Sequence, residues 1–387
     1  ILLKKGMFTS VEDLSWFRTQ CGLGEELASV LLDESMSQGM SPSKLTRVKC
    51  LGADGQELLT MVLKQSQANQ TSADGGLARE AYFYNHFSKS VSEIVRLPKI
   101  YFASAEEKTG AKAMLMEDLS TATQAGFFFD PKQPNNYGKD VASLTAGTNI
   151  TQDRVAQAIF GATAKLHARF WQDKDLSKTP YLRGSQWTEE NWSKGQAISL
   201  NAMKAPKVKE FLALPKWSFV RELLDASASL SSFAAYNTWR ETVPHTLVHG
   251  DFHPGNMMVL ADPDGTMSDE ERCCFLDWEM VGVGSGPQEL GQFLISHATS
   301  EWRRQNEGSL LKEYFTVLQT KINDESYSFE ACWAEYISGG LSKWLWFLPL
   351  LIYGCPPPMA EYFCQKVVDF AKDHNISPQN VQMLRFF

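Results

Sequence analysis

The ten-residue stretch LVHGDFHPGN, at residues 247–256, constrains the fold more than any other part of the chain. It stands between the apolar run that ends at Val248 and the apolar run MMVL at 257–260. Its residue types disfavour the interiors of helices and strands, so we expect a loop, followed by a short strand at 257–260 and a second short strand at 273–277. Pro254 stiffens this loop, and Gly255 allows the backbone to turn tightly before the next residue. The fold must therefore hold Asp251 and Asn256, five positions apart, on one stiff loop.

The first 118 residues have the pattern of a mostly antiparallel sheet with one inserted helix. Polar and apolar residues alternate in several short runs separated by turn residues, which is typical of strands. The expected strands cover residues 44–51, 57–64, 99–106 and 112–119. Glu80, Tyr84 and Phe87 recur at helical spacing, which predicts a helix over 77–87. The first two strands, joined by the turn at 52–56, form a hairpin.

Helical patterns dominate the remainder of the chain. After a connection at 120–150 that is rich in Gly, Pro, Asn and Thr, an apolar stripe runs from Val155 to Phe170. Further helices are expected near residues 215–236, 287–299, 309–322, 329–347 and 358–373. Near the N-terminus, Ser10 is expected to cap a helix over 10–20, which GLGEELASVLLDE continues after a glycine break. The pattern indicates an α+β protein with a smaller sheet-containing part and a larger helical part.

Five residues, in order along the chain, match the needs of phosphoryl transfer from ATP. That reaction requires a carboxylate for the attacking hydroxyl, ligands for Mg²⁺, and a lysine for the phosphates with its own carboxylate partner. Asp251 and Asn256 have the spacing of the kinase catalytic loop. Asp277 follows an apolar strand in FLDWE, Lys64 ends a predicted strand, and Glu80 lies on the next predicted helix. Taken singly, these residues have ordinary structural explanations: Lys64 could be a solvated lysine, Glu80 a surface glutamate and Asp277 a turn cap. The occurrence of all five in this order along the chain favours a phosphoryl-transfer site.

These motifs resemble those of the aminoglycoside phosphotransferase and choline kinase superfamily, the small-molecule relatives of protein kinases. LVHGDFHPGNMMV and FLDWEMVGVGSG are similar to its catalytic and metal-binding motifs, and AKLHARFW resembles a family helix before the catalytic loop. REAYFYNHF, LPKIYFAS and AMLMEDL resemble the CHK-kinase-like, or ecdysteroid-kinase-like, branch. The resemblance implies a bilobal protein-kinase-like fold. Its N-lobe, residues 1–118, would hold an antiparallel sheet plus helix, and its C-lobe, residues 119–387, would be helical and carry the substrate pocket.

The resemblance also implies a role for each of the five residues. Asp251 is expected to be the catalytic base, and Asn256 and Asp277 are expected to bind Mg²⁺. Lys64 is expected to hold the α- and β-phosphates of ATP, and Glu80 is expected to anchor Lys64. The acceptor would be a hydroxyl group of a small molecule.

The nucleotide would meet two further segments. The expected hinge, whose backbone contacts adenine, consists of Met116, Glu117 and Asp118. There is no G-x-G-x-x-G motif, and the candidate phosphate-covering turn is SQGMSPSK at 37–44, with Gly39, Ser41 and Ser43. Backbone N–H groups and hydroxyls in such a turn can still hold phosphate.

Four residues near the motifs are expected to support the site rather than to react. His249 is expected to be a structural loop residue, and His253 to lie just behind the reacting groups. His167, beside an apolar stripe, is expected to be a core or loop-supporting histidine. Glu289 stands in GSGPQELGQFL where the family usually has an aspartate with a structural role, and a glutamate can fill that role with a shifted backbone.

The composition excludes several classes of function. A formal net charge of -8 and a pI near 5.5 disfavour a nucleic-acid surface. No apolar run reaches the roughly 18 residues that a membrane helix needs. Seven cysteines without a C-x-x-C pair predict a reduced, cytoplasmic protein without structural zinc. Because the chain begins at Ile1, the alternative is an organelle lumen reached after removal of a targeting segment.

The acceptor itself is open at this level. The expected pocket, between 120–150, 181–204 and the final helices, would carry Trp187, Trp192, Trp344, Trp346 and Tyr353. These aromatic residues suggest a bulky, partly apolar alcohol, or choline held by cation–π contact, unless they are core residues. An aminoglycoside would want an acidic pocket such as Glu189 and Glu190 provide, unless these begin a solvated helix.

Two other classes of function remain as alternatives. The first is a catalytically inactive kinase fold that serves as a binding or assembly module, which the missing glycine motif favours. The second is a protein kinase, which the absence of an A-P-E-like stretch and the presence of H-G-D in place of H-R-D disfavour. All five catalytic, metal and phosphate residues are present, which favours an active small-molecule kinase.

Overall fold

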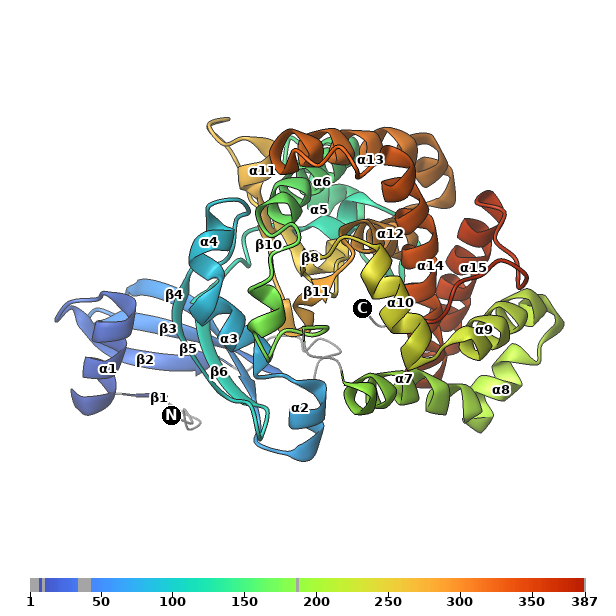
Figure 1. Ribbon diagram of the computed structural model, residues 1–387. Coiled ribbons are helices and arrows are strands. Elements are labelled where there is room, and N and C mark those ends of the chain that lie inside the picture. Colours follow the sequence, from blue (N-terminus) through green and yellow to red (C-terminus); the bar gives the residue numbers. More distant parts are fainter. Residues whose placement is uncertain (1–6, 9–10, 34–42, 186–187, 386–387) are drawn as a thin grey trace. The chain divides into compact units, whose positions relative to one another are not determined.

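The computed structural model describes residues 7–8, 11–33, 43–185 and 188–385, and it divides into two compact units (Figure 1). The first unit contains Ile1–Ala122 together with Cys274–Met280. The second unit contains Thr123–Cys273 and Val281–Phe387. The segment that carries Asp277 therefore belongs to the sheet-containing unit, although the helical unit supplies the chain on both sides of it.

A six-stranded antiparallel sheet forms the framework of the first unit, with the strand order β1-β2-β3-β4-β6-β5. The strands are β1 (Met7–Phe8), β2 (Leu27–Asp33), β3 (Lys44–Gly52), β4 (Glu57–Ser66), β5 (Ile100–Glu106) and β6 (Ala111–Glu117). The four predicted strands are confirmed. Lys64 lies opposite Leu45 of β3 and Met114 of β6, so it occupies a central strand rather than a strand end.

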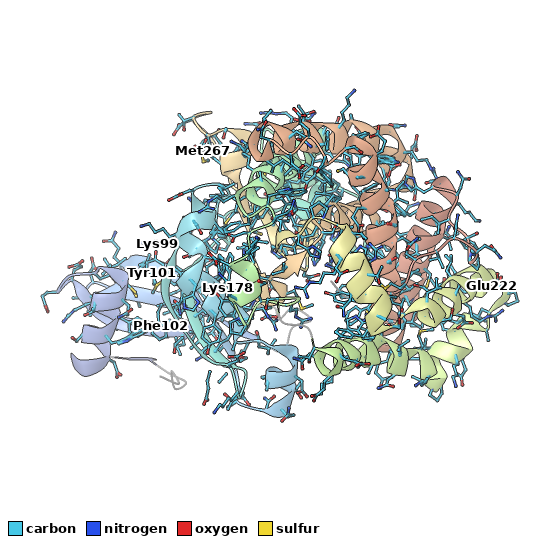
Figure 2. All side chains as sticks on the ribbon, viewed as in Figure 1. Lys99, Tyr101, Phe102, Lys178, Glu222 and Met267 are labelled. Atoms are coloured by element: carbon cyan, nitrogen blue, oxygen red, sulfur yellow. The ribbon has the colours of Figure 1, made fainter. Side chains whose placement is uncertain are left out.

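β5 is the edge strand on one side of the sheet, and the charged residue Lys99 immediately precedes it. The Lys99 ammonium lies 4.6 Å from the centroid of the Tyr101 ring, and both side chains are seen with Phe102 in Figure 2. A lysine at a sheet edge discourages pairing with another chain.

The N-terminal region differs from the sequence prediction. Helix α1 (Val11–Cys21) forms as expected, although Ser10 lies outside the described residues, but the next segment is strand β2 rather than a continued helix. Gly22 has a φ of +68°, which ends the helix and turns the chain. Leu27 and Val30 are then buried against Val48 in one core cluster. Pairing with β3 outweighs the helix-like spacing of the apolar residues.

Three short helices lie between β4 and β5. They are α2 (Gln70–Gly75), α3 (Arg79–His86) and α4 (Ser88–Ser92). The predicted helix over 77–87 corresponds to α3, on which Glu80 and Tyr84 are buried. The Phe83 ring stacks on Trp278, with ring centroids 4.1 Å apart, so the 3-10 turn η6 (Trp278–Met280) packs beside α3.

Helices make up most of the second unit (Figure 1). The predicted helices correspond to α6 (Gln152–Arg169), α9 (Ser218–Leu230), α10 (Phe233–Thr242), α12 (Gly286–His297), α13 (Ser300–Ile322), α14 (Phe329–Gly354) and α15 (Pro357–Asp373). The helices that were not predicted are α5 (Val141–Ala146), α7 (Glu189–Lys204), α8 (Pro206–Leu212) and α11 (Asp269–Arg272). The predicted helix at 215–236 is two helices, because Ser231 leaves helical geometry and Ser232 caps α10. None of the helices among the described residues has the length and apolarity needed to cross a membrane.

Short strands frame the LVHGDFHPGN loop. β8 (Thr246–Val248) ends just before it and pairs antiparallel with β11 (Gly282–Gly284). β9 (Met257–Val259) begins just after it and pairs antiparallel with β7 (Thr123–Gln124). The short strand expected at 257–260 is thus confirmed, and the one expected at 273–277 corresponds to β10 (Cys273–Phe275). β8 was not predicted, and β8 and β9 are each fixed by a partner from a distant part of the chain.

Helices α12 and α14 approach each other through two glycines. A Cβ atom on Gly291 would lie 2.6 Å from the Cα atom of Gly340, which is closer than real side chains allow. Only glycine fits at this crossing, and every residue of α12 is buried. The close approach brings polar side chains from both helices to the LVHGDFHPGN loop.

Candidate active site

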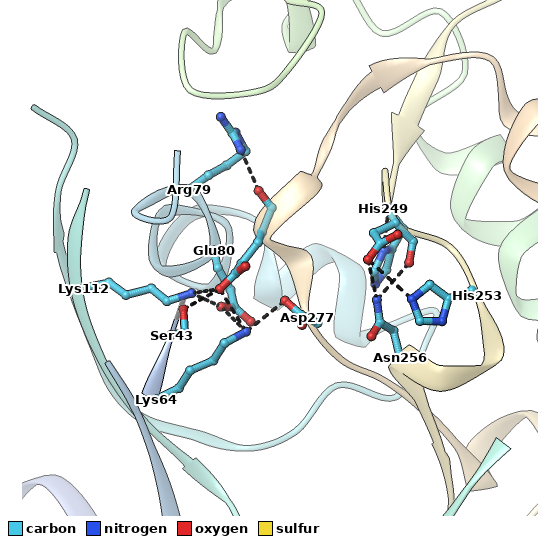
Figure 3. A network of polar contacts seen from close by, with 11 residues as sticks. Ser43, Lys64, Arg79, Glu80, Lys112, His249, His253, Asn256 and Asp277 are labelled. Carbon is cyan, nitrogen blue, oxygen red and sulfur yellow. Dashed lines mark hydrogen bonds and ion pairs between the residues drawn. The ribbon is translucent and has the colours of Figure 1, made fainter. Parts of the chain in front are cut away.

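Lys64 and Glu80 form a buried ion pair in the first unit. Lys64 Nζ lies 2.8 Å from Glu80 Oε2, and the two side chains are 8% and 0% exposed. Lys64 also contacts Asp277 Oδ1 at 2.9 Å and Glu279 Oε1 at 3.2 Å. The structure therefore brings together three residues that the sequence placed in three separate motifs, Lys64, Glu80 and Asp277 (Figure 3).

A second buried lysine, which the sequence did not reveal, completes this cluster. Lys112 Nζ on β6 lies 2.5 Å from both Glu80 Oε2 and Glu279 Oε1. The Ser43 hydroxyl donates a hydrogen bond to the same Glu279 oxygen at 2.8 Å. We call Lys64, Glu80, Lys112, Asp277 and Glu279 the carboxylate–lysine cluster. Its three carboxylates face two ammonium groups, so the cluster carries an excess of negative charge.

Burial acts to raise the pKa of both carboxylates of the FLDWE motif, but the neighbouring charges act differently on the two. Burial raises the pKa of Asp277 to about 6, because the nearby charges of Glu80 and Glu279 oppose the favourable charge of Lys64. Burial also acts to raise the pKa of Glu279, but the charges of Lys64 and Lys112 outweigh it and lower that pKa to about 2. Asp277 adopts a φ of +62°, an unfavourable conformation for a residue with a side chain. An added cation would relieve the excess negative charge at Asp277.

The carboxylate oxygens of this cluster are suited to Mg²⁺. One oxygen each from Glu80, Asp277 and Glu279 lies within 4.8 Å of the others. Mg²⁺ prefers such hard oxygen ligands and commonly uses one or two carboxylates together with phosphates. Among the described residues, Glu80 Oε1 is buried without a hydrogen-bond partner. Asp277, whose side chain is a third exposed, is the carboxylate most accessible to an incoming ion.

In the second unit, two residues of the LVHGDFHPGN loop and one residue of α12 hold the Asp251 carboxylate. Gln292 Nε2 donates a hydrogen bond to Asp251 Oδ1 at 3.0 Å, and Asn256 Nδ2 donates to Asp251 Oδ2 at 3.1 Å. His253 Nε2 lies 3.4 Å from the same Oδ2 atom (Figure 3). Asn256 also donates to the Asp251 backbone carbonyl at 3.0 Å. The structure thus holds Asp251 and Asn256 in one hydrogen-bonded unit.

The surroundings of Asp251 keep it ionised. Burial alone would raise its pKa, but the electrostatic interaction and hydrogen bond with His253, together with electrostatic interactions with His249 and Lys343, lower the pKa below its usual range. An ionised carboxylate accepts a hydrogen bond from a hydroxyl group and can take up its proton when that hydroxyl becomes a nucleophile. His253 contacts the Asp251 carboxylate, so it lies next to the proposed reacting group, as expected from the sequence.

Glu289 on α12 supports the start of the loop. Its carboxylate accepts the backbone N–H groups of His249 at 3.0 Å and Gly250 at 2.5 Å. His167 Nε2 lies 3.3 Å from it, and His167 Nδ1 lies 2.8 Å from the Tyr314 hydroxyl. Glu289 therefore has the structural position expected of the family's aspartate, and His167 is a fully buried residue that supports it.

We expect Glu289→Gln to destabilise the second unit by about 1–3 kcal/mol, because the amide of glutamine would face a backbone N–H donor that loses its acceptor. Urea unfolding monitored by tryptophan fluorescence measures this change. Glu313→Gln, on the exposed face of α13, is the matched control and should have little effect. Equal stability of the two variants would show that Glu289 does not hold the loop.

The remaining predicted residues occupy simpler positions. His249 is buried, and its Nδ1 atom accepts the Asp251 N–H at 3.3 Å, which agrees with the expected structural role. Met116 is buried in β6. The Glu117 backbone N–H is bonded to the Lys99 carbonyl at 2.8 Å, and the Asp118 side chain pairs with Arg47 at 2.8 Å. Gly39 and Ser41 lie outside the described residues.

The aromatic residues expected around a pocket serve mainly as core. Trp192, Trp344 and Trp346 are buried. The Trp344 indole donates to the Gln292 carbonyl at 3.2 Å, and the Trp346 indole donates to the Gly195 carbonyl at 3.3 Å. Tyr353 is 58% exposed at the end of α14, and Trp187 lies outside the described residues. Aromatic content is therefore no evidence for an apolar acceptor.

The two acidic residues considered for an aminoglycoside begin a solvated helix. Glu189 and Glu190 are exposed in the first turn of α7, which Thr188 caps. Glu190 pairs with Lys194 one turn later at 2.7 Å. Acidic residues in the first turn stabilise a helix through its dipole, so this position needs no ligand to explain it.

Glu279 and Lys112 were the main residues that sequence reasoning missed. Glu279 is visible as the second acid of FLDWE, two positions after Asp277. Lys112 is visible only as a lysine in the strand AKAMLME, between Ala111 and the apolar run 113–116. A charge on a buried strand position signals a buried partner, because an unpaired ammonium is too costly to bury.

Comparison with known proteins agrees with this geometry. The sequence profile of the phosphotransferase enzyme family matches residues 46–328, a range that contains all five predicted catalytic, metal and phosphate residues. No curated protein matches the chain significantly in sequence. A choline kinase from Cryptosporidium parvum Iowa II is similar in structure, with a TM-score of 0.51 and 10% identity over 96% of this chain and 99% of that one.

A mutant aminoglycoside 2′-phosphotransferase-IIIa in complex with GDP is also similar in structure. Its TM-score is 0.50, with 12% identity over 94% of this chain and 98% of that one. At such low identities the likeness concerns the fold alone. It confirms the predicted α+β, protein-kinase-like fold class, in which an antiparallel sheet is followed by a mostly helical region.

Proposed function

This chain belongs to the phosphotransferase enzyme family, and we propose that it transfers the γ-phosphoryl group of ATP to a hydroxyl group of a small molecule. The observation that carries the proposal is the meeting of Lys64, Glu80 and Asp277 in one buried cluster. Those three residues come from separate motifs, and their buried cluster has more carboxylates than ammonium groups, which suits a bound cation and phosphates. The retention of Asp251 and Asn256 on a fixed loop favours an active enzyme over a catalytically inactive binding module.

In the proposed reaction each residue has one task. Asp251 accepts a hydrogen bond from the acceptor hydroxyl, orients it, and takes its proton as the new O–P bond forms, while the bond from the γ-phosphorus to the bridging oxygen breaks and ADP leaves. Lys64, which Glu80 keeps in place, binds the α- and β-phosphates. Asn256 and Asp277 would hold Mg²⁺, which would neutralise part of the phosphate charge. Residues 1–118 would serve as the nucleotide-binding lobe and 119–387 as the lobe that binds the acceptor.

The finer assignment rests on sequence motifs. REAYFYNHF, LPKIYFAS and AMLMEDL support membership of the CHK-kinase-like or ecdysteroid-kinase-like branch. In this assignment Met116 and Asp118 present their backbone to adenine. Glu117 has a supporting role there, because its N–H is already bonded within the sheet. The acceptor is a small alcohol.

A thermal shift with ATP, with and without Mg²⁺, tests the nucleotide site directly. A ligand that binds only the folded protein stabilises it by about 2.7 kcal/mol at a hundredfold excess over its Kd. We expect a Mg²⁺-dependent rise of the melting temperature in the wild type that is lost in Asp277→Ala. Glu93→Ala, which removes an exposed carboxylate from the same unit, should keep the shift. No shift with millimolar MgATP in the wild type would contradict the proposed function.

A further inference from the structure

We propose that Lys343 is a positioning residue whose buried ammonium fixes the peptide that leads into Asp251. This inference rests on the proposed function, since it concerns the residue assigned as the base. Lys343 lies on α14, outside the motifs that indicated the site, and its side chain reaches the LVHGDFHPGN loop.

The peptide between Gly250 and Asp251 is held at both of its polar ends. Lys343 Nζ donates a hydrogen bond to the Gly250 carbonyl at 2.6 Å. The N–H group of the same peptide, which belongs to Asp251, donates to His249 Nδ1 at 3.3 Å. Gly250 has a φ of +84°, so this peptide lies at a turn that glycine permits. The direction in which the Asp251 side chain leaves the backbone depends on the orientation of this peptide.

Two helices share the task of holding the loop. Glu289 on α12 binds the N–H groups of His249 and Gly250, whereas Lys343 on α14 binds the carbonyl that follows. The crossing of Gly291 and Gly340 fixes the spacing of these helices within one turn of both side chains. The α12–α14 pair thus fixes the backbone of the loop at residues 249–251.

A structural role alone does not explain why this residue is a lysine. Lys343 is 2% exposed, and burying an ammonium costs free energy that an apolar side chain would not incur. Met, which has a similar shape, would fill the space without that cost. A cation at this place does two things that Met cannot, because it binds the Gly250 carbonyl and places a positive charge near Asp251 and Glu289.

The charge of Lys343 is poised to change at mildly basic pH. Burial lowers its pKa, and so does the charge of Arg183, while the charges of Glu289 and Asp251 act to raise it. The resulting pKa is about 8, so Lys343 is charged at neutral pH and loses its proton as the pH rises above that value. A neutral amine binds the carbonyl more weakly, so catalysis should fall over the same range.

Two variants separate the charge from the shape of the side chain. Lys343→Met removes the charge, and Lys343→Arg keeps it at every accessible pH. Lys366→Met removes another buried lysine of the same unit, whose partners are Asp130 and the Ala298 carbonyl rather than the loop, and is the control for general destabilisation. Because the acceptor is unidentified, the probe is MgATP turnover with water as acceptor, followed by phosphate release from pH 6 to 10 at a temperature where all variants are folded.

The expected result is a change in kcat and in its pH profile. Lys343→Met should lower kcat at pH 7 by about 10–100-fold, since a small misplacement of a catalytic group costs up to about that much, with little change in KM for MgATP. It should also lose the decline above about pH 8 that the wild type shows. Lys343→Arg should lose the same decline. A Lys343→Met variant with wild-type kcat and pH profile would overturn the inference.

Amide hydrogen exchange of residues 249–252 in the free protein gives a second readout that needs no activity. Exchange there should be faster in Lys343→Met than in Lys366→Met, and equal rates would overturn the proposed positioning role. The thermal shift with MgATP reports separately on the nucleotide site. Failure of the proposed function would therefore appear as absent MgATP binding in the wild type, whereas failure of this inference would appear as unchanged exchange and kinetics in Lys343→Met.

Discussion

Replacing Asp251 by Asn should lower MgATP turnover by about 10²–10⁴-fold, the contribution typical of a positioned general base. The amide of asparagine cannot take up the proton of the attacking hydroxyl. MgATP binding should remain, because Lys64, Glu80 and Asp277 supply the proposed phosphate and metal contacts without Asp251. Release of ADP measures turnover, and the Mg²⁺-dependent thermal shift measures binding in the same sample.

The hydrogen bonds of Asp251 call for a stability control. Gln292 and Asn256 each donate an N–H to one of its carboxylate oxygens, so asparagine would place an NH₂ group against one of these donors. A displaced side chain would then add to the loss of turnover. Asp251→Glu, which keeps a carboxylate, and Asp251→Ala, which removes the side chain, help to separate this displacement from the loss of the base. Asp264→Asn, on an exposed turn of the same unit, should leave turnover unchanged. Near-full turnover by Asp251→Asn would show that the base has been assigned wrongly.

The parts of the site that could be predicted are those in which local sequence and local structure agree. Asp251 and Asn256 lie on one short loop whose proline and glycine limit its conformations, so their spacing alone indicated that they meet. Lys64 lies on β4 and Glu80 on α3, two elements with a clear period that only the short helix α2 separates, and the structure pairs them. The alternating pattern also identified the central strands correctly.

The missed features depend on contacts between distant parts of the chain. The apolar residues of β2 fit a helix as well as a strand, and only pairing with β3 decides between them. Lys112 looks like a solvated lysine until Glu80 and Glu279 are placed beside it. Lys343 stands in an apolar helix, and nothing nearby in sequence indicates that its partner is the Gly250 carbonyl. Sequence periodicity reports which face is buried, but not which charges meet there.

Replacing Lys112 by Met should strongly destabilise the first unit. Lys112 is fully buried between Glu80 and Glu279, and removal of one partner from a buried ion pair typically costs about 3–5 kcal/mol. Lys64 would then face three carboxylates alone. Urea unfolding at pH 7 measures the loss, and Lys89→Met, on an exposed turn of α4, should change stability by less than about 0.5 kcal/mol.

The pH dependence shows whether charge, rather than packing, causes this loss. In the wild type, burial is outweighed by Lys64 and Lys112, and the pKa of Glu279 is lowered from 4.5 to about 2. A lowered carboxylate pKa stabilises the folded state above the unfolded pKa, and this stabilisation is lost as the pH falls toward the folded pKa. Lys112→Met loses much of that stabilisation. The difference in unfolding free energy between wild type and variant should therefore be largest above about pH 5 and should decrease toward about pH 3. If this difference in unfolding free energy stayed constant from pH 7 to pH 3, Lys112 would act through packing alone. The carboxylate–lysine cluster would then not be held together by charge.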